Sequence, residues 1–163
     1  MHKKGDSPAT RIPAIGEGKR GIQGHLIYLL RQANATSRLT LDRALLDQGI
    51  TFPQFSALTM IAAYPDLSSA DLARLALQTP QTMNVLVKSF ERGRLIRRRP
   101  DAIHGRVQRL EMTSKGRRLL TRCRATTDRI EAAMQAELPK TDEAAVRRWL
   151  VHVAARLSKG TNA

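Results

Sequence analysis

The stretch TPQTMNVLVKSFERGRLIRRRPDAIHGRVQRLEMT, residues 79–113, is the most informative about the fold, because the spacing of its apolar residues changes once along its length. Before Gly93 the apolar residues recur at helical spacing. After Gly93 two segments with an extended pattern, Leu95–Arg99 and Val107–Thr113, flank the polar turn Pro100–Gly105. We therefore predict a helix that is followed directly by a β-hairpin.

Positive charge is concentrated in the same stretch. Residues 91–109 contain seven arginines and only two acidic residues, and the whole chain of 163 residues has a net charge of +14. Arginines outnumber lysines by 21 to 7. Because guanidinium groups suit phosphates and guanine edges, this composition favours a polyanionic partner. The alternative is the solvated surface of an arginine-rich protein.

Three short helices are expected in the region that ends with this stretch. Thr51 can begin the first, and Ser68 with Asp71 three residues later resembles a capping box for the second. Thr79 and Pro80 supply a cap and a first-turn proline for the third. Three short helices followed by a basic hairpin are the layout of a winged helix-turn-helix, whose last short helix enters the DNA major groove.

Longer helical patterns lie on both sides of this motif. One runs over residues 22–48 and ends at Gly49, a second is capped by Ser114 and ends at Pro139, and a third is capped by Thr141. The last helix carries the apolar residues Val146, Trp149, Leu150, Val153 and Leu157. Because these stripes are larger than the central motif can cover, they predict a homodimer.

These patterns together predict a mainly α fold with a small β-hairpin wing, that is, a winged helix-turn-helix plus an α-helical dimerisation region. Residues 1–20 lack periodicity and predict a flexible basic arm. Residues 21–50 and 114–160 are expected to form the dimerisation region, and residues 51–113 the DNA-binding domain. A twofold axis would place the two recognition helices roughly 34 Å apart, which is one DNA turn.

The helix expected over residues 79–92 has two chemically different faces. Met83, Leu86, Val87 and Phe90 share one of them. The other face carries polar side chains that can pair with base edges and a valine that can contact a thymine methyl. The residues predicted to contact DNA from this helix are Thr79, Gln81, Thr82, Asn84, Val85, Lys88 and Arg92. An ordinary amphipathic helix with a solvated outer face is the alternative.

The turn of the hairpin is too polar and too basic to be packed in a core. Arg106, just after Gly105, can be presented at the tip, where a narrow and electronegative minor groove attracts arginine. Arginines on the strands would lie near phosphates. They would fix the position of the protein on the duplex and contribute less to its preference for particular base sequences. The predicted wing contacts are Arg97, Arg98, Arg99, His104, Arg106 and Arg109.

Over nearly all of residues 22–157 the chain resembles the MarR family of bacterial transcriptional regulators. Three segments carry the resemblance in the family's order and spacing: LLDQGITFPQFSALTMIAAYPDLSSADLARLA, TPQTMNVLVKSFERGRLIRRRPD and GRVQRLEMTSKGRRLL. The resemblance implies an obligate homodimer that binds short palindromic operators, with a recognition helix over residues 79–92 and a wing over residues 95–113. Where the family commonly has Asp-x-Arg, this chain has His104-Gly105-Arg106, so the arginine matches and the aspartate does not. His104 either adds charge near neutral pH or serves only as a turn residue.

The resemblance also implies a small effector, a phenolic or aromatic acid or its thioester, bound between the dimer helices and the winged domain. His25, Tyr28 and Gln32 follow one edge of the first helix, and Phe55 and Tyr64 can come near. Such a mixed lining suits an aromatic anion. The alternative is that these five residues simply form the boundary between core and solvent.

Other classes of function find little support in the sequence. The histidines, His2, His25, His104 and His152, have no metal-ligand spacing, and no phosphate loop, nucleophile elbow or pair of catalytic carboxylates is present. We therefore expect no enzyme activity, no metal and no cofactor. Cys123 lies on an apolar stripe and is expected to be a small buried hydrophobe instead of an oxidant sensor.

Two further expectations concern the setting of the protein. No apolar run approaches the ~18 residues needed to cross a bilayer, so we expect a cytoplasmic protein without membrane contact. The expected partners are double-stranded DNA, a second copy of the chain and a small-molecule effector. The competing function is a nonspecific or architectural nucleic-acid-binding protein, for which the charge of +14 is sufficient explanation.

Overall fold

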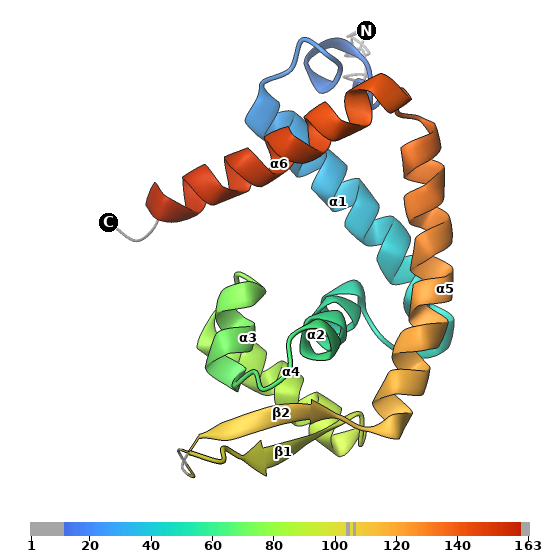
Figure 1. Cartoon of the computed structure of the whole chain (residues 1–163). Coiled ribbons are helices and arrows are strands. Elements are labelled where there is room, and N and C mark those ends of the chain that lie inside the picture. Colours follow the sequence, from blue (N-terminus) through green and yellow to red (C-terminus); the bar gives the residue numbers. More distant parts are fainter. Residues whose placement is uncertain (1–11, 104, 106, 161–163) are drawn as a thin grey trace, which may run out of the picture. The chain divides into compact units, whose positions relative to one another are not determined.

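The computed structural model describes residues 12–103, 105 and 107–160 (Figure 1). The chain divides into two compact units, Met1–Thr40 and Leu41–Ala163, and each is described by itself. Residues 1–11, the first part of the predicted arm, lie outside the described residues, as do His104 and Arg106 of the predicted wing.

The first unit contains the 3-10 helix η1 (Gly18–Arg20) and most of α1 (Leu26–Leu45). The expected start of this helix at residue 22 is wrong, because two tight turns precede α1. The N–H of Gly21 donates to the carbonyl of Gly18, and the N–H of Gly24 donates to the carbonyl of Gly21. A Cβ atom on Gly24 would lie 2.3 Å from the carbonyl oxygen of Lys19, so the chain can approach itself this closely only at a glycine.

Three short helices of the second unit agree with the sequence prediction. They are α2 (Phe52–Ala63), α3 (Ser69–Leu75) and α4 (Pro80–Arg92). The predicted caps are confirmed, since the side-chain oxygens of Thr51, Ser68 and Thr79 each accept a hydrogen bond from the backbone N–H three residues later. Before α2, residues Leu46–Gln48 form the separate 3-10 helix η2, which ends at Gly49.

The predicted β-hairpin is present and is attached to the helices along one edge. β1 (Ile96–Pro100) pairs antiparallel with β2 (Gln108–Met112), with Ile96 opposite Met112. On its other side β2 lies beside the segment that precedes α3, where the N–H of Leu110 donates to the carbonyl of Leu67 at 2.8 Å. Leu110 and Met112 are buried, so the hairpin packs one face against the helices.

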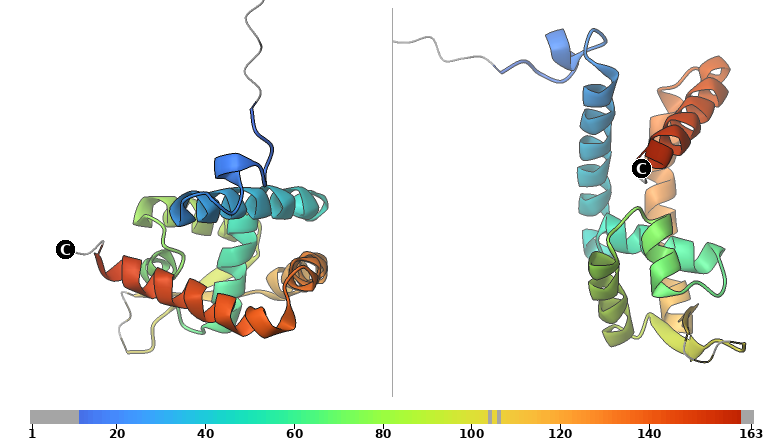
Figure 2. Two further views of the ribbon diagram at one scale, coloured as in Figure 1. Left: turned by 90° about the horizontal axis from the view of Figure 1, so that it is seen from above. Right: turned by 90° about the vertical axis from the view of Figure 1, so that its left-hand side faces the viewer.

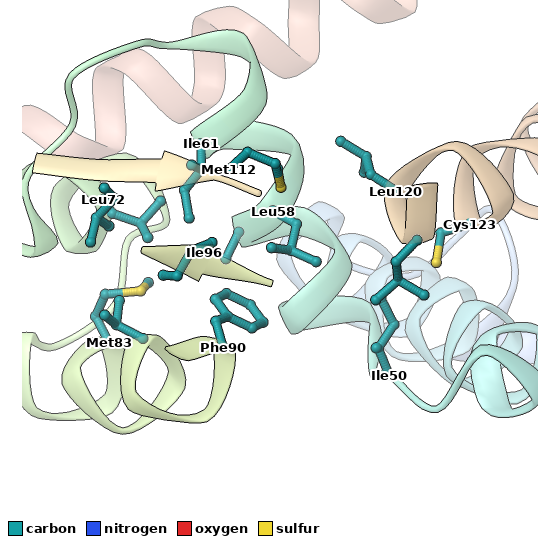
Figure 3. Close-up of a cluster of buried hydrophobic side chains, with 14 of the residues drawn as sticks. Ile50, Leu58, Ile61, Leu72, Met83, Phe90, Ile96, Met112, Leu120 and Cys123 are labelled. Atoms are coloured by element: carbon teal, nitrogen blue, oxygen red, sulfur yellow. The ribbon is translucent and has the colours of Figure 1, made fainter. Parts of the chain in front are cut away.

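The core of the second unit joins α2, α3, α4, the hairpin and the following helix. Figure 3 shows Leu58, Leu72, Met83 and Phe90 converging from the three short helices, with Ile96 between them. These five side chains are at most 3% exposed. Burial of this kind holds α4 by one face only, which leaves its opposite face to solvent.

Two long helices complete the unit, α5 (Ser114–Ala136) and α6 (Lys140–Gly160). Both predicted caps are wrong, because Ser114 and Thr141 lie inside the helices. Thr113 caps α5, because its hydroxyl oxygen accepts from the N–H of Gly116 and its hydroxyl group can donate to the carbonyl of Leu95. Thr141 lies inside the first turn of α6, which begins at Lys140 after Pro139.

Figures 1 and 2 show α4 and the hairpin at one end of the second unit and α6 at the other. Several apolar side chains of α6 are open to solvent in the single chain, Val146 at 37%, Trp149 at 39% and Leu150 at 45% exposed. Such a stripe agrees with the dimerisation region predicted for residues 114–160, which stays a prediction. Among the described residues no helix is long and apolar enough to span a membrane.

Candidate nucleic-acid interface

The outward face of α4 gathers most of the predicted base-contacting residues. Gln81, Asn84, Lys88 and Arg92 are all accessible to solvent, and Val85 among them is 64% exposed. The opposite face is buried in the core, so the helix cannot rotate without breaking its packing. The sequence pattern therefore predicted correctly which side of α4 meets solvent.

Thr79 and Thr82, also predicted to contact DNA, have a local task at the start of α4. The hydroxyl group of Thr79 accepts a hydrogen bond from the N–H of Thr82 at 3.1 Å. It also donates a hydrogen bond to the side-chain oxygen of Thr82 at 2.9 Å. Both residues are exposed. Any contact that they make with DNA would thus be added to this capping arrangement.

A shallow hollow lies beside the outward face of α4. It has a volume of about 540 Å³, and its walls come from the start of α2 and from α4. Its lining residues are Thr51, Gln54, Gln81, Thr82, Val85, Leu86, Ser89 and Arg92. The predicted base-contacting side chains therefore stand on a surface that is concave toward α2.

The strand arginines of the wing are already paired with acidic side chains. Arg97 makes two hydrogen bonds to Glu111 across the hairpin, at 3.0 and 2.9 Å, which lowers the pKa of the Glu111 carboxyl group. Arg98 donates to a carboxylate oxygen of Glu91 at 2.8 Å, and Arg99 pairs with Asp66. Much of the hairpin's positive charge is thus balanced within the chain.

Arg109 is the least exposed of these arginines and connects three parts of the unit. Its Nε donates to a carboxylate oxygen of Asp101 at 2.6 Å, and its Nη1 donates to the carbonyl of Asp66 at 3.0 Å. The same Nη1 lies 3.6 Å from a carboxylate oxygen of Asp71 at the start of α3. This role could not be inferred from the sequence, because Asp66 lies 43 residues before Arg109 and the two meet only in the folded unit.

The tip of the wing can be described only in part, since His104 and Arg106 lie outside the described residues. The turn begins in an ordered way, because the N–H of Ile103 donates to a side-chain oxygen of Asp101 at 2.9 Å. Ile103 itself is 85% exposed. Asp101 therefore supports both the turn and Arg109.

A group of cations that was not predicted from the sequence lies next to the end of α4. Lys115, in the first turn of α5, donates from Nζ to the carbonyl of Gly93 at 2.9 Å. Arg118 and Arg122 follow on the same helix and line the same cleft. The run KGRR in the sequence was the available signal, but its position beside α4 depends on the fold.

The predicted ligand-binding residues fall into separate groups. In the first unit His25 and Tyr28 line a hollow of about 340 Å³ together with Lys19, Arg20, Gln23 and Gly24. Gln32 exchanges hydrogen bonds with Arg20, accepting from its Nε at 3.2 Å and donating to its carbonyl at 3.1 Å. The two cations of this hollow were not predicted from the sequence.

The other two predicted ligand residues belong to the second unit. Phe55 packs against the core with its ring 6.4 Å from that of Phe52, whereas Tyr64, 54% exposed, lines a different hollow with Asp71 and Arg74. Phe55 is absent from the lining of that hollow. The shared ligand site expected for Phe55 and Tyr64 therefore stays a prediction.

The cysteine and the possible metal ligands give no sign of a reactive centre in the part of the chain that the structure describes. Cys123 is buried, and burial raises the pKa of its thiol. Among the described residues no group of three histidine, cysteine, aspartate or glutamate side chains could hold a metal ion.

Comparison with known sequences identifies the family. A sequence model of the MarR family matches residues 48–107. The chain is 34% identical over 123 residues to the HTH-type transcriptional repressor Rv2887 of Mycobacterium tuberculosis strain H37Rv, a match that covers 76% of this chain and 88% of the repressor. The repressor Mb2911 of Mycobacterium bovis matches equally well. The chain therefore belongs to the MarR family of transcriptional regulators.

Solved structures agree with this assignment. A structure of Rv2887 from Mycobacterium tuberculosis with salicylic acid shares 33% sequence identity and a TM-score of 0.64, covering 80% of this chain and 96% of that one. A MepR–DNA complex from Staphylococcus aureus has a TM-score of 0.75 at 24% identity, covering 82% and 98%. The predicted fold, mainly α with a small β-hairpin wing, is confirmed.

Proposed function

We propose that this chain is a homodimeric repressor that reads a palindromic DNA operator and is released from it by an aromatic acid or its thioester. One observation carries the proposal. The face of α4 opposite the core presents Gln81, Asn84 and Lys88 to solvent around the exposed Val85. Amide, ammonium and small apolar groups are those that recognise base edges in the major groove.

The hairpin supplies the second part of the proposed interface. Arg97, Arg98 and Arg99 exchange their carboxylate partners for phosphates when DNA approaches, since their ion pairs lie at the surface and are weak in water. Arg106 at the tip would enter the minor groove. Arg109 acts mainly by holding the hairpin against α3.

The dimer is supported by the apolar side chains that α6 leaves open in the single chain. Trp149 and Leu150 are 39% and 45% exposed, and Leu157 is 61% exposed. A second copy related by a twofold axis would cover them and set two copies of α4 on one face of the duplex, roughly one turn apart. Operator symmetry and dimerisation therefore form a single prediction.

The proposed effector site is the hollow of the first unit. Its two cations, Lys19 and Arg20, suit a carboxylate, and Tyr28 and His25 suit an aromatic ring. Gln32 holds Arg20 through two hydrogen bonds. The relative Rv2887, which has been solved with salicylic acid and with p-aminosalicylic acid, supports this chemistry.

Calorimetric titration with salicylate tests the effector site. We expect Arg20→Ala to weaken binding about tenfold or more, because it removes a charged hydrogen bond to the carboxylate. Arg38→Ala removes the same charge from α1 outside the hollow and should leave the affinity unchanged. Equal affinities for the two variants would place the effector elsewhere.

Selection from a random pool of duplex DNA, followed by sequencing, tests the main proposal. The wild type should enrich a twofold-symmetric site with half-sites about one turn apart and bind it ~10³-fold or more tightly than random DNA at matched salt. Asn84→Ala should reduce that ratio, whereas Arg98→Ala should weaken binding to all sequences alike.

A second candidate function, nonspecific or architectural binding to nucleic acid, is favoured by the charge of +14. The selection experiment separates the two. Tight binding without enrichment of any site, together with an Asn84→Ala variant that behaves as the wild type does, would favour the nonspecific binder and overturn the proposal.

A further inference from the structure

The first turns of α5 carry an unusual concentration of positive charge. Residues 115–124 contain five cationic side chains and no acidic one, and the first acid of the helix is Asp128. The N-terminus of a helix is itself the positive end of its dipole, and α5 has no acidic residue in its first turn. These charges therefore oppose helix formation locally, so helix stability does not explain them.

Three of the five cations lie on one side of the helix. Lys115, Arg118 and Arg122 line a cleft of about 420 Å³, whose remaining walls come from residues 48–50, Gly93, Leu95 and Leu119. All three cationic side chains are exposed. Because positions three, four and seven apart share one face of a helix, they form a continuous cationic strip.

The strip begins at the end of the recognition helix. The Nζ atom of Lys115 lies 2.9 Å from the carbonyl oxygen of Gly93, which is the C-cap of α4. A duplex that contacts the outward face of α4 therefore has this strip close to one end of its footprint. Figure 1 shows the start of α5 next to the hairpin and the end of α4.

The strip differs from the wing in how its charge is balanced. Arg97, Arg98 and Arg99 each have an acidic partner within the chain. None of the ion pairs formed among the described residues includes Lys115, Arg118 or Arg122, and no acidic residue lines their cleft. Their charge is thus available to an anion from outside the chain.

We propose that Lys115, Arg118 and Arg122 form a phosphate-binding surface that contacts the DNA backbone beside the segment that α4 contacts. The proposal rests on the proposed function, since it requires a bound duplex. Guanidinium forks bind phosphate oxygens through two hydrogen bonds at once, and the ammonium group adds a point charge. Backbone contacts of this kind add affinity and salt dependence without adding sequence preference.

Salt dependence of operator binding tests the proposal. The dissociation constant of the operator found by selection is measured between about 50 and 200 mM salt for the wild type and for Arg118→Ala/Arg122→Ala. The slope of the logarithmic plot should fall by about 0.9 for each phosphate that the variant no longer neutralises. The ratio of operator to random-DNA affinity at matched salt should stay as in the wild type.

A matched control comes from the same helix. Arg117→Ala/Arg124→Ala removes two arginines that do not line the cleft and should keep a slope closer to that of the wild type. Arg118→Lys/Arg122→Lys retains the charge and should restore most of the slope. If the first variant is found to be unfolded by circular dichroism, Arg118→Gln/Arg122→Gln replaces it with a smaller change in packing.

The outcomes separate this proposal from the function on which it rests. A wild type that enriches no operator overturns the proposed function. A wild type that selects its operator, with equal slopes for the wild type and the cleft variant, or for the cleft variant and the control, overturns the phosphate surface alone. Calorimetric binding of inorganic phosphate to the cleft, with an unchanged slope for DNA, would assign it to a free anion and also overturn the proposal.

Discussion

The guanidinium of Arg109 donates a 2.6 Å hydrogen bond to the carboxylate of Asp101 at the turn end of the hairpin. Only 24% of the Arg109 side chain and 15% of that of Asp101 are exposed. The same guanidinium also binds the carbonyl of Asp66. The arginine that the sequence suggests as a phosphate contact therefore fastens the wing to the helices.

We expect Arg109→Ala to destabilise the protein by about 1–3 kcal/mol, because a poorly exposed carboxylate loses its partner. Arg109→Lys should restore only part of this, since an ammonium group cannot reproduce the forked geometry. Urea denaturation measures both. In Arg99→Ala the broken pair is far more exposed, at 47% and 64%, and the expected cost is below about 1 kcal/mol. An equal cost for the two alanine variants would contradict the structural role of Arg109.

Gly116 should tolerate no side chain. A Cβ atom there would lie 2.1 Å from the carbonyl oxygen of Leu95 and 2.7 Å from the sulfur of Met112, where the hairpin passes over α5. Gly116→Ala should therefore cost about 1–3 kcal/mol or separate the hairpin from the helix. Gly105→Ala is the control, because a Cβ atom at that glycine meets nothing within 4 Å. The thermal midpoints of the two variants check this expectation.

Arg94 has a backbone φ of 56°, in the left-handed region that disfavours residues with a Cβ atom. It follows the C-cap of α4, a position that glycine commonly occupies. We expect Arg94→Gly to stabilise the protein by about 0.5–1 kcal/mol, after allowing for the greater freedom of glycine in the unfolded chain. Arg92→Gly removes the same charge inside α4 and should instead cost about 1 kcal/mol. Urea midpoints that shift in the same direction for both would refute the argument.

Asp71 makes the free energy of unfolding depend on pH in the acidic range. Its pKa lies below the ordinary value, first because the hydroxyl and N–H groups of Ser68 donate to its carboxylate. Because the carboxyl pKa is lower in the folded than in the unfolded state, the stabilisation is present above about pH 4 and is lost as the pH falls toward the folded pKa. Asp71→Asn should lose stability at neutral pH and show a shallower decline between about pH 5 and pH 3. Parallel curves for wild type and variant would exclude this role.

Cys123 should not respond to oxidants. Its side chain is fully buried, and burial raises the pKa of the thiol, so little thiolate is available at neutral pH. We expect operator affinity after treatment with hydrogen peroxide to equal that of the untreated protein. A thiol reagent should react with Cys123 only when urea unfolds the chain. A loss of affinity that a reducing agent reverses would instead make Cys123 a sensor.

The order of helices and hairpin follows from the sequence because the signals are local. Thr51, Ser68 and Thr79 each bind a backbone N–H only three residues away, so the caps can be recognised without knowledge of the fold. The change from helical to alternating period at Gly93 is equally local. The same periodicity determined which face of α4 is buried.

The balance of each cation by an acidic partner depends on contacts between residues that are distant in sequence. Arg109 finds its partners at Asp66, Asp71 and Asp101, and Lys115 reaches Gly93, all across turns whose geometry no short pattern specifies. An ion pair needs atoms within about 4 Å, and side chains distant in sequence meet at that range only once the core has formed. The positive charge and the two faces of α4 can therefore be derived from local sequence patterns, whereas the surface positions where that charge has no acidic partner depend on the packing of the whole second unit.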